Sequence, residues 1–451
     1  MAMEFIVEII HEEIIKPSSP TPLHLKTSKL SLFDQVAPMV YVPLIFCYRN
    51  DDNNDFAKAE ARSQVLKTSL SKTLTRFYPF AGRLSSSSSI ECNDQGVDYV
   101  QTRVNCRLQD ILKQPVGESL AKLLPSSQMG SKEAATKPLL LVKVNFFECG
   151  SMAIGINFSH KVADLFTMKF FIKTWAAMAQ QGSSSDVVLP VPDFKTIPSL
   201  FPPLDLPVAS ESDALGQLRK GVASRRLVFD ASKISMLKAQ VVSRDVPQPT
   251  RVEAVAGIIW KCAMAAAKTN RGGFKKQSGL LQVVDLRKRM NPPLPQHSTG
   301  SLQSFLVVET LDCETELQSL VKQLRNGMRD RSSESSMSKL QGSDAVSEIL
   351  LGFKQVGSLL QRDDLDVYFC SSWCRFELYE SADFGWGKPK WVSNGIGHEN
   401  NPSKPNSFIL MDSMDGEGIE ARVNLVEGEM AFFECNRELL AFASVNPCVK
   451  L

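Results

Sequence analysis

The first half of the chain alternates between strand-like and helix-like spacing of its apolar residues. Residues 4–15 alternate acidic and apolar positions, which predicts a strand with one wet face. Residues 139–147 and 152–158 are apolar runs on either side of a short Glu-Cys-Gly-Ser segment, which predicts two strands joined by a tight turn. Residues 57–77 and 165–180 repeat apolar positions at helical spacing, so we expect each to form a helix with one buried side.

The remaining pattern favours mixed sheets with helices packed against them. Residues 30–46 are apolar and contain Pro38 and Pro43, so short strands are expected there rather than a helix. The second half predicts strands at 225–229, 280–286, 302–310, 367–373, 407–412 and 418–425, and helices at 232–242, 251–268 and 314–360, the last with a Ser-rich break at 332–338. Since strands and helices do not alternate strictly, we expect an α/β fold with mixed sheets rather than a doubly wound one.

Length and a change in composition divide the chain into two expected domains. A chain of 451 residues is too long for one ordinary core, and two domains are the default expectation. Residues 181–213 are rich in Ser and Pro and show no apolar period, as a long crossover would. We therefore expect an N-terminal domain at 1–185, a crossover loop at 186–218 and a C-terminal domain at 219–451.

Composition and charge argue against several classes of function. The 51 Lys and Arg residues against 49 Asp and Glu leave a net charge of +2, which does not support nucleic-acid binding. No apolar run reaches the length of a membrane span, and the acidic N-terminus does not resemble a secretory signal. The 10 cysteines form no C-x-x-C pair, and no His/Cys cluster has metal-ligand spacing. We expect a cytoplasmic protein with free thiols, without a bound metal, and with neither a membrane nor a nucleic acid as partner.

His160 is a candidate general base. It is one of only 5 histidines, and it stands where an apolar run ends and an amphipathic one begins. A neutral imidazole can take a proton near pH 7 if it reaches the group that loses the proton. Asp164 lies one helical turn further along the chain, and two interpretations of it are open. It could orient His160 as in a catalytic triad, or it could pair with an arginine elsewhere and hold the loop in shape.

The segment Asp383-Phe384-Gly385-Trp386-Gly387 is a second candidate. Glycines on both sides of an aromatic residue predict a tight backbone path around a buried ring. The aspartate could act in the chemistry, or the loop could hold the walls of a site.

A third candidate is the basic end of the strand predicted at 280–286. Asp285-Leu286-Arg287-Lys288-Arg289 places three cations close together, which could meet a phosphate, pair with buried acids or form a solvated charged run. The chain has no G-x-S-x-G elbow, no G-x-x-x-x-G-K-[ST] loop and no complete G-x-G-x-x-G, so the corresponding hydrolase and nucleotide sites are not indicated.

Together these motifs resemble one family over essentially the whole chain. The segments around His160 and Asp383 resemble the two signature motifs, H-x-x-x-D and D-F-G-W-G, of the plant BAHD acyl-CoA-dependent acyltransferases, and the second motif is highly specific. Other matching segments are Tyr78-Pro79-Phe80-Ala81-Gly82-Arg83, Asp285-Leu286-Arg287-Lys288-Arg289-Met290 and Ser371-Ser372-Trp373-Cys374-Arg375. Residues 16–22 and 30–35 are most similar to the branch that contains vinorine synthase and salutaridinol acetyltransferase, which mostly moves acetyl or other short acyl groups.

The resemblance implies an α/β fold of two similar mixed-sheet domains related to chloramphenicol acetyltransferase, with a solvent channel between them. It also implies that a segment at about 381–403 returns to pack on the first domain. Acyl-CoA, with acetyl-CoA favoured, would be a co-substrate rather than a permanently bound cofactor. It would meet a small-molecule alcohol in the channel of a monomeric enzyme.

The same resemblance implies roles for individual residues. His160 would remove the proton of the acceptor hydroxyl, whose oxygen would attack the thioester directly. Trp373 and Ser371 would line the position of the oxyanion, and Asp383 is grouped with these catalytic candidates through its motif. Structural roles at the site would fall to Asp164, Arg287, Gly385, Trp386 and Gly387, with Arg287 as the partner of Asp164. Contacts to coenzyme A would fall to Asp285, Ser301 and Ser372.

One position departs from the family pattern, because Gly300-Ser301 stands where Gly-Asn is usual. Serine keeps a hydrogen-bonding group but loses an amide, which could alter efficiency or the position of coenzyme A. Three functions stay open: an O-acyltransferase acting on a plant metabolite, a catalyst that uses the same pocket for cyclisation or acyl exchange, and a non-catalytic ligand-binding relative. The acceptor is not fixed by these motifs, because function lives in the site rather than in the fold.

Overall fold

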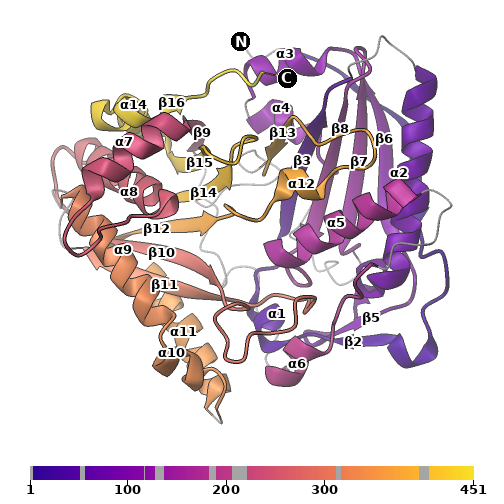
Figure 1. Ribbon diagram of the computed structural model, residues 1–451, viewed down its shortest axis with the longest axis horizontal. Helices are drawn as coiled ribbons and strands as arrows, with labels where there is room; N and C mark the ends of the chain where they lie inside the picture. Colours follow the sequence, from indigo (N-terminus) through magenta and orange to yellow (C-terminus); the bar gives the residue numbers. More distant parts are fainter. Residues whose placement is uncertain are drawn as a thin grey trace.

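Two mixed β-sheets form the framework of the molecule and lie side by side (Figure 1). The computed structural model describes residues 4–50, 56–115, 117–126, 137–181, 189–205, 221–310, 316–342, 344–395 and 406–450. Both sheets contain parallel and antiparallel neighbours, so the expected α/β fold with mixed sheets is confirmed. In the described parts of the chain, no helix has both the length and the apolar character needed to cross a membrane.

The first sheet comes almost entirely from the N-terminal half. Its strands, in spatial order, are β1 (Val7–Ile15), β6 (Val97–Val104), β7 (Leu140–Phe147), β8 (Met152–Ser159), β3 (Tyr41–Tyr48) and β13 (Trp391–Ser393). Helices α2 (Phe56–Arg76) and α5 (Leu165–Gln181) pack against each other on one face. Every second residue of β8, from Met152 to Phe158, enters the core beneath them, as the period-two pattern predicts.

Short elements complete the N-terminal half. α3 (Leu108–Lys113) and α4 (Gly117–Ala121) contribute to a smaller core that also contains Ala153 of β8. A three-stranded sheet is formed by β2 (Thr27–Lys29), β5 (Ser89–Glu91) and β4 (Arg83–Leu84), with 3-10 turns at Leu23–Leu25 and Tyr78–Ala81.

The second sheet carries the C-terminal half. Its strands, in spatial order, are β11 (Gln303–Thr310), β10 (Gln277–Asp285), β12 (Leu365–Ser372), β14 (Ser407–Asp412), β15 (Ile419–Val426), β9 (Val222–Phe229) and β16 (Ser444–Val445). Its outer face is covered by α7 (Ala231–Val241), α8 (Arg251–Asn270), α9 (Leu317–Arg331), α13 (Glu427–Phe433) and α14 (Arg437–Phe442). Thr250 caps α8 and forms a reciprocal capping box with Glu253, as expected for a Thr that precedes a helical pattern.

One segment of the C-terminal half crosses to the first sheet. β13 pairs antiparallel with β3, Trp391 opposite Cys47, so the chain from α12 (Leu378–Ser381) to β13 lies against the N-terminal half (Figure 1). This is the part of the expected excursion at 381–403 that falls within the described residues. Of the expected crossover at 186–218, only 189–205 is described, and it contains α6 (Thr196–Leu200). The domain boundaries stay predictions.

Two sequence-based expectations are confirmed only in part. Residues 30–46 contain the start of strand β3, but also a helix, α1 (Leu32–Val36), because the buried Ser31 and Asp34 form a capping box that outweighs the strand-like composition. β1 is a strand whose apolar residues are buried at Ile15 but 56% exposed at Ile9 and Ile14, because it is an edge strand interrupted by a bulge.

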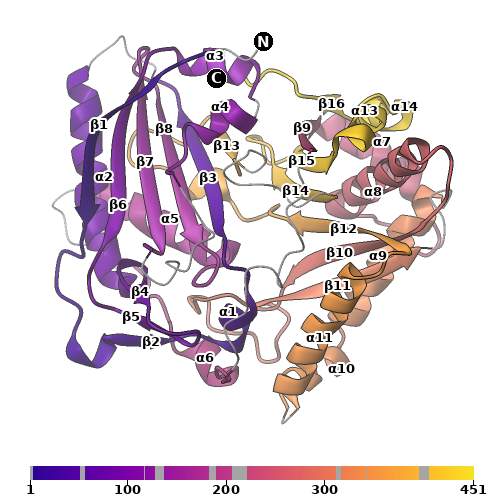
Figure 2. The ribbon, with the colours of Figure 1, turned by 180° about the vertical axis from the view of Figure 1, so that it is seen from behind.

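The long helical region at 314–360 is three helices: α9, α10 (Glu334–Lys339), which fills the expected break, and α11 (Ala345–Leu360). Leu32 and Phe33 of α1 pack with Leu286 and Leu302 of the second half, so the short helix lies where the two halves meet (Figure 2).

Candidate active site

His160 lies immediately beyond the end of β8. Its backbone N–H donates to the carbonyl of Val40 at 2.9 Å, and the preceding residue, Ser159, is paired with Tyr41 of β3. The end of the sheet therefore fixes the backbone of His160 from two strands. Its side chain is only partly buried, so the imidazole stands at the rim of the first core rather than inside it.

The imidazole is held in its neutral form by its surroundings. Burial lowers the pKa of His160 below its ordinary value of 6.5, and the residue's own backbone and the charge of Asp164 oppose this only in part. Nδ1 is enclosed and has no partner from another residue among those described. Nε2 is not enclosed in this way, which makes it the ring nitrogen that solvent or a ligand can reach.

Asp164 faces away from His160 and toward the second half of the molecule. Arg287 Nη1 donates to Asp164 Oδ2 at 2.5 Å, and Arg287 Nη2 donates to Asp164 Oδ1 at 3.2 Å. Both side chains are buried, with 4% of Arg287 and 8% of Asp164 exposed. Of the two interpretations of Asp164, the pairing with a distant arginine is the one present, and no hydrogen bond joins Asp164 to the His160 ring.

Backbone N–H groups occupy the rest of the Asp164 carboxylate. The N–H of Thr167 donates to Oδ1 at 3.0 Å, as expected for an aspartate at the start of α5, and the N–H of Leu302 donates to Oδ2 at 3.1 Å. Arg287 is in turn shared with Asp285, at 3.1 Å, and the two acids raise the pKa of the guanidinium although burial opposes its charge. The carboxylate is thus saturated with four donors and ties α5 to β10 and β11.

Ser301 lies directly behind the catalytic candidate. Its hydroxyl donates to the backbone carbonyl of His160 at 3.2 Å, and its N–H donates to Asp34 Oδ1 at 2.6 Å. Ser301 has no exposed surface. The structure thus places Ser301 against the backbone of His160, and its assignment to coenzyme A stays a prediction.

Asp34 and Thr167 were missed as site residues by the sequence analysis. Asp34 accepts from the hydroxyl and the N–H of Ser31, and Thr167 bonds both the N–H and the carbonyl of Gly300. Burial raises the pKa of Asp34, although its hydrogen bonds from Ser31 and Ser301 oppose the shift. The Ser31-x-x-Asp34 spacing was the available signal, since it is a helix-start signature.

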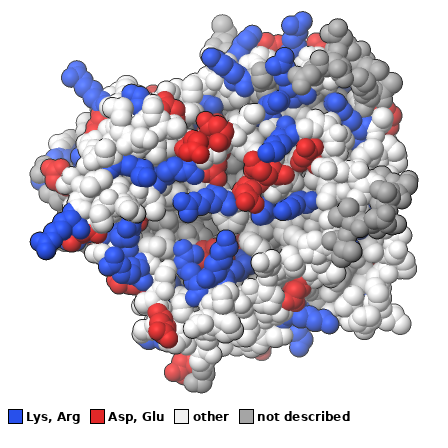
Figure 3. Space-filling view, viewed as in Figure 1, with Lys and Arg blue, Asp and Glu red and all other residues white. Residues whose placement is uncertain are grey.

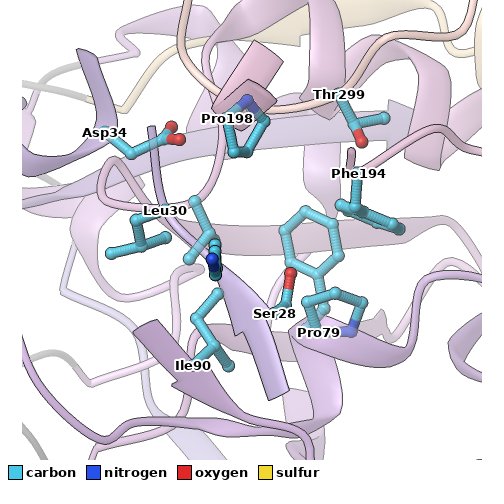
Figure 4. Close-up of a pocket in the computed structure, with 12 residues that line it drawn as sticks. Ser28, Leu30, Asp34, Pro79, Ile90, Phe194, Pro198 and Thr299 are labelled. Atoms are coloured by element: carbon cyan, nitrogen blue, oxygen red, sulfur yellow. The ribbon is translucent and has the colours of Figure 1, made fainter. Parts of the chain in front are cut away.

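A small cavity lies on the far side of the Gly300 turn (Figure 4). Asp34, Thr299 and Phe194 line it together with Pro198, and Figure 4 shows their side chains around a common space. Its walls come from both halves of the molecule, because Asp34 belongs to α1 of the N-terminal half and Thr299 lies between β10 and β11. His160 is not among its lining residues.

Ser371, Ser372 and Trp373 end β12, the central strand that faces the first half. Trp373 Nε1 donates to Ser371 Oγ at 3.1 Å, and Trp373 packs into the same core cluster as Phe158 and Val162, which flank His160 in sequence. Ser372 instead lies beside the thiol of Cys374. The structure thus brings Trp373 and Ser371 toward the side of the molecule that carries His160.

The Asp383 loop is built around its own aspartate. Asp383 Oδ1 accepts from the N–H of Gly385 at 2.9 Å and from the N–H of Gly387 at 3.1 Å, and both glycines have positive φ. Phe384 packs edge-on against Trp175 of α5 at 4.9 Å. The loop therefore covers the helical side of the first sheet, and the Asp383 carboxylate is engaged in shaping it.

Comparison with known proteins places these features in a family. The model of the Transferase family matches residues 5–440. The chain is 37% identical over 447 residues to the 17,18-epoxy-17-hydroxycur-19-ene N-malonyltransferase of Strychnos nux-vomica, covering 98% of this chain and 91% of that protein. The crystal structure of vinorine synthase superposes with a TM-score of 0.82 at 35% identity, covering 99% of this chain and 100% of that one.

A more distant structure shares the fold alone. TRI101 of F. sporotrichioides, solved in complex with coenzyme A and T-2, has a TM-score of 0.69 at 17% identity and covers 93% of this chain and 99% of its own. Among the described residues, no group of three or more His, Cys, Asp or Glu is placed to hold a metal ion.

The chain belongs to the Transferase family, which is the family of the BAHD acyltransferases that its motifs indicate. It is an acyl-transferring enzyme.

Proposed function

We propose that this enzyme transfers a short acyl group from a coenzyme A thioester to a hydroxyl group of a plant specialised metabolite, with His160 as the general base. The observation that carries the proposal is the state of the imidazole. It is partly accessible, its pKa is lowered by burial, and its neighbour Asp164 is fully engaged by Arg287. A neutral histidine with a free Nε2 is suited to take a proton from an alcohol.

The reaction then needs one base and one oxyanion donor. His160 Nε2 takes the proton of the acceptor hydroxyl while its oxygen forms a bond to the thioester carbonyl carbon. The carbonyl oxygen becomes an oxyanion, and the intermediate collapses by breaking the carbon–sulfur bond. The departing thiolate receives the proton that His160 carries, so the imidazole returns to its neutral form and no acyl-enzyme is required.

Ser371 is the donor that best fits the oxyanion. Trp373 Nε1–H is already directed at Ser371 Oγ, which uses the indole donor and leaves the serine O–H free to point elsewhere. We therefore assign stabilisation of the oxyanion to the Ser371 hydroxyl, with Trp373 orienting it.

The surface charge is compatible with an anionic co-substrate. Figure 3 shows Lys and Arg side chains gathered near the middle of one face, over the boundary between the two halves, with acidic groups interspersed. Such a distribution would attract the phosphates of coenzyme A. The fold is shared with TRI101, whose solved complex contains coenzyme A. Acetyl-CoA and malonyl-CoA are both candidate donors, since one relative is named a malonyltransferase.

The test is release of free thiol from acetyl-CoA and malonyl-CoA in the presence of a panel of plant alcohols. His160→Ala is expected to lower turnover by about 10²–10⁴-fold, the usual contribution of a general base. His24→Ala, at an exposed histidine, is the matched control and should keep wild-type turnover. Full activity in His160→Ala would overturn the base assignment, and product formation without any thioester would favour cyclisation or acyl exchange.

Two further expectations have their own tests. Size-exclusion chromatography of the active protein tests the expected monomeric state, and microscopy of a fluorescent fusion tests the expected cytoplasmic location.

A further inference from the structure

A buried arginine on the second sheet has no carboxylate partner among the described residues. Arg422 of β15 is 6% exposed, and its one hydrogen bond within the described residues runs from Nη2 to Ser393 Oγ at 3.4 Å. No ion pair with an acid is formed by Arg422 among these residues. A guanidinium carries five N–H donors, and the bond to Ser393 uses one of them.

The neighbouring charges do not neutralise this arginine. Arg226 and Glu420 are paired with each other at 2.7 Å, and Glu420 also accepts from Trp391 Nε1 at 3.1 Å. Burial, together with the nearby charge of Arg226, lowers the pKa of Arg422 to about 10, while Glu420 acts in the opposite direction. Arg422 therefore stays charged at neutral pH, and the cluster holds one positive charge in excess.

The strand register places Arg422 in line with the proposed oxyanion donor. Ser371 of β12 is opposite Ile409 of β14, and Ile409 is opposite Arg422. Residues opposite each other on adjacent strands share one face of a sheet, and two strand spacings amount to about 10 Å. Ile409 packs against the core of the first half, so this row of residues faces the other sheet.

Further polar atoms near Arg422 are also unused. Ser393, the partner of Arg422, is followed by Asn394, whose buried Nδ2 has no acceptor among the described residues. Asn424, two residues beyond Arg422 on β15, has a buried Oδ1 without a donor there. Unmatched buried polar groups are unfavourable for folding alone, and they are typical of sites that are completed by a ligand.

We propose that Arg422 binds a substrate carboxylate at the acyl-transfer centre, either the far carboxylate of a dicarboxylic acyl group such as malonyl or a carboxylate on the acceptor. A planar guanidinium matches a carboxylate through two parallel hydrogen bonds, and the match is strongest where water is excluded. The inference deepens the proposed function and rests on it, because it assumes that the acyl thioester reaches the row that contains Ser371.

The first experiment measures binding of malonyl-CoA, butyryl-CoA and free coenzyme A to the full chain by isothermal titration calorimetry. The wild type is expected to bind malonyl-CoA at least tenfold more tightly than butyryl-CoA, and Arg422→Leu should lose this preference. Arg422→Lys should keep part of it, because the charge remains without the planar fork. Arg225→Leu is the matched control, since Arg225 lies on the adjacent strand β9 and pairs with Glu434 on the helical side.

The second arm assigns the carboxylate to the acceptor. It compares binding of 4-hydroxyphenylacetate and its methyl ester by NMR titration, in the presence of coenzyme A. A preference for the acid that disappears in Arg422→Leu supports the acceptor as the source, whereas a preference only among the thioesters supports the acyl group. Absence of any Arg422-dependent carboxylate preference in both arms overturns the inference.

Two readouts keep this test separate from folding and from the proposed function. Arg422→Leu is expected to unfold at the same temperature as the wild type or higher, because it removes an unmatched buried charge. A large loss of stability would show that protein groups already satisfy Arg422, and it would contradict the inference. Failure of the wild type to bind free coenzyme A would refute the proposed function, whereas coenzyme A binding without a carboxylate preference refutes only the role of Arg422.

Discussion

Asp164 and Arg287 form a buried ion pair that joins the two halves of the molecule across 123 positions of sequence, with Nη1 and Oδ2 2.5 Å apart. The pair is adjacent to the proposed base without touching its ring. It fixes the start of α5 and the turn at Gly300, between which the backbone of His160 is held. Because the imidazole of the proposed base and the Asp164 carboxylate do not touch, substitutions at the two residues should have different effects.

Asp164→Asn should lower stability as well as activity. Loss of the charge leaves a buried guanidinium with Asp285 as its remaining acidic partner, and breaking such a pair costs about 3–5 kcal/mol of unfolding free energy. Urea unfolding measures this loss. Asp364→Asn, which breaks an exposed pair with Arg362, is the control and should leave the unfolding curve close to wild type. A fully stable but inactive Asp164→Asn protein would restore the triad interpretation.

The pH dependence should follow the lowered pKa of His160. The neutral imidazole is the active form, so kcat/KM falls where His160 becomes protonated. Because burial lowers this pKa, the acidic limb should lie below pH 6.5. The same shift makes stability depend on pH. Because His160 is protonated more readily in the unfolded chain than in the folded one, its contribution to the free energy of unfolding is present above about pH 6.5. That contribution is lost as the pH falls below this value. An acidic limb well above pH 6.5 would contradict the assignment.

Ser301→Ala should act on kcat rather than on the binding of coenzyme A. The substitution removes the hydroxyl that donates to the His160 carbonyl, a hydrogen bond worth about 0.5–1.5 kcal/mol. We expect kcat to fall by up to about tenfold with little change in KM for acyl-CoA. Steady-state kinetics with varied acyl-CoA distinguishes the two parameters. A raised KM at constant kcat would support the original assignment of Ser301 to the cofactor.

Ser371→Ala and Trp373→Phe should differ in severity. Removing the proposed oxyanion donor is expected to lower kcat by about 10²–10³-fold. Trp373→Phe removes only the N–H that orients Ser371, so its effect on kcat should be smaller, and both proteins should bind coenzyme A normally. If Trp373→Phe were the more damaging substitution with its fold intact, the indole rather than the serine would be the donor.

Asp383→Ala should reduce stability more than chemistry. Two exposed backbone N–H groups of the glycine loop would lose their acceptor, at a cost of about 0.5–1.5 kcal/mol for each hydrogen bond. Thermal unfolding measures the loss, and activity per folded molecule should stay near wild type. Glu380→Ala, which removes an exposed partner of Lys388 in the same segment, is the control. Normal stability with lost turnover would return Asp383 to the catalytic set.

Local chemistry in the sequence determined most of the secondary structure that carries the site. The period of apolar residues gave the limits of β7, β8, α2 and α5 to within about two residues, because each element buries one face against a common core. The capping box of Thr250 and Glu253 is equally local, since both residues lie within one helical turn. α1 was missed because prolines and strand-forming residues surround a helix of only five residues.

The tertiary structure decided which side chains work together. Ser301 lies 141 positions from His160, and Asp34 lies 267 positions from Ser301, so no local pattern could show that these residues form one support. The charge of Arg422 is visible in the sequence, but its burial without an acid depends on the packing of β15 against β13. The period of apolar residues predicts which face of a single helix or strand is buried. Which distant elements touch each other depends on how those buried faces pack in the folded protein. The motifs thus indicated the family and a candidate base, and the tertiary structure shows that the Asp164–Arg287 ion pair supports His160 without contacting its ring.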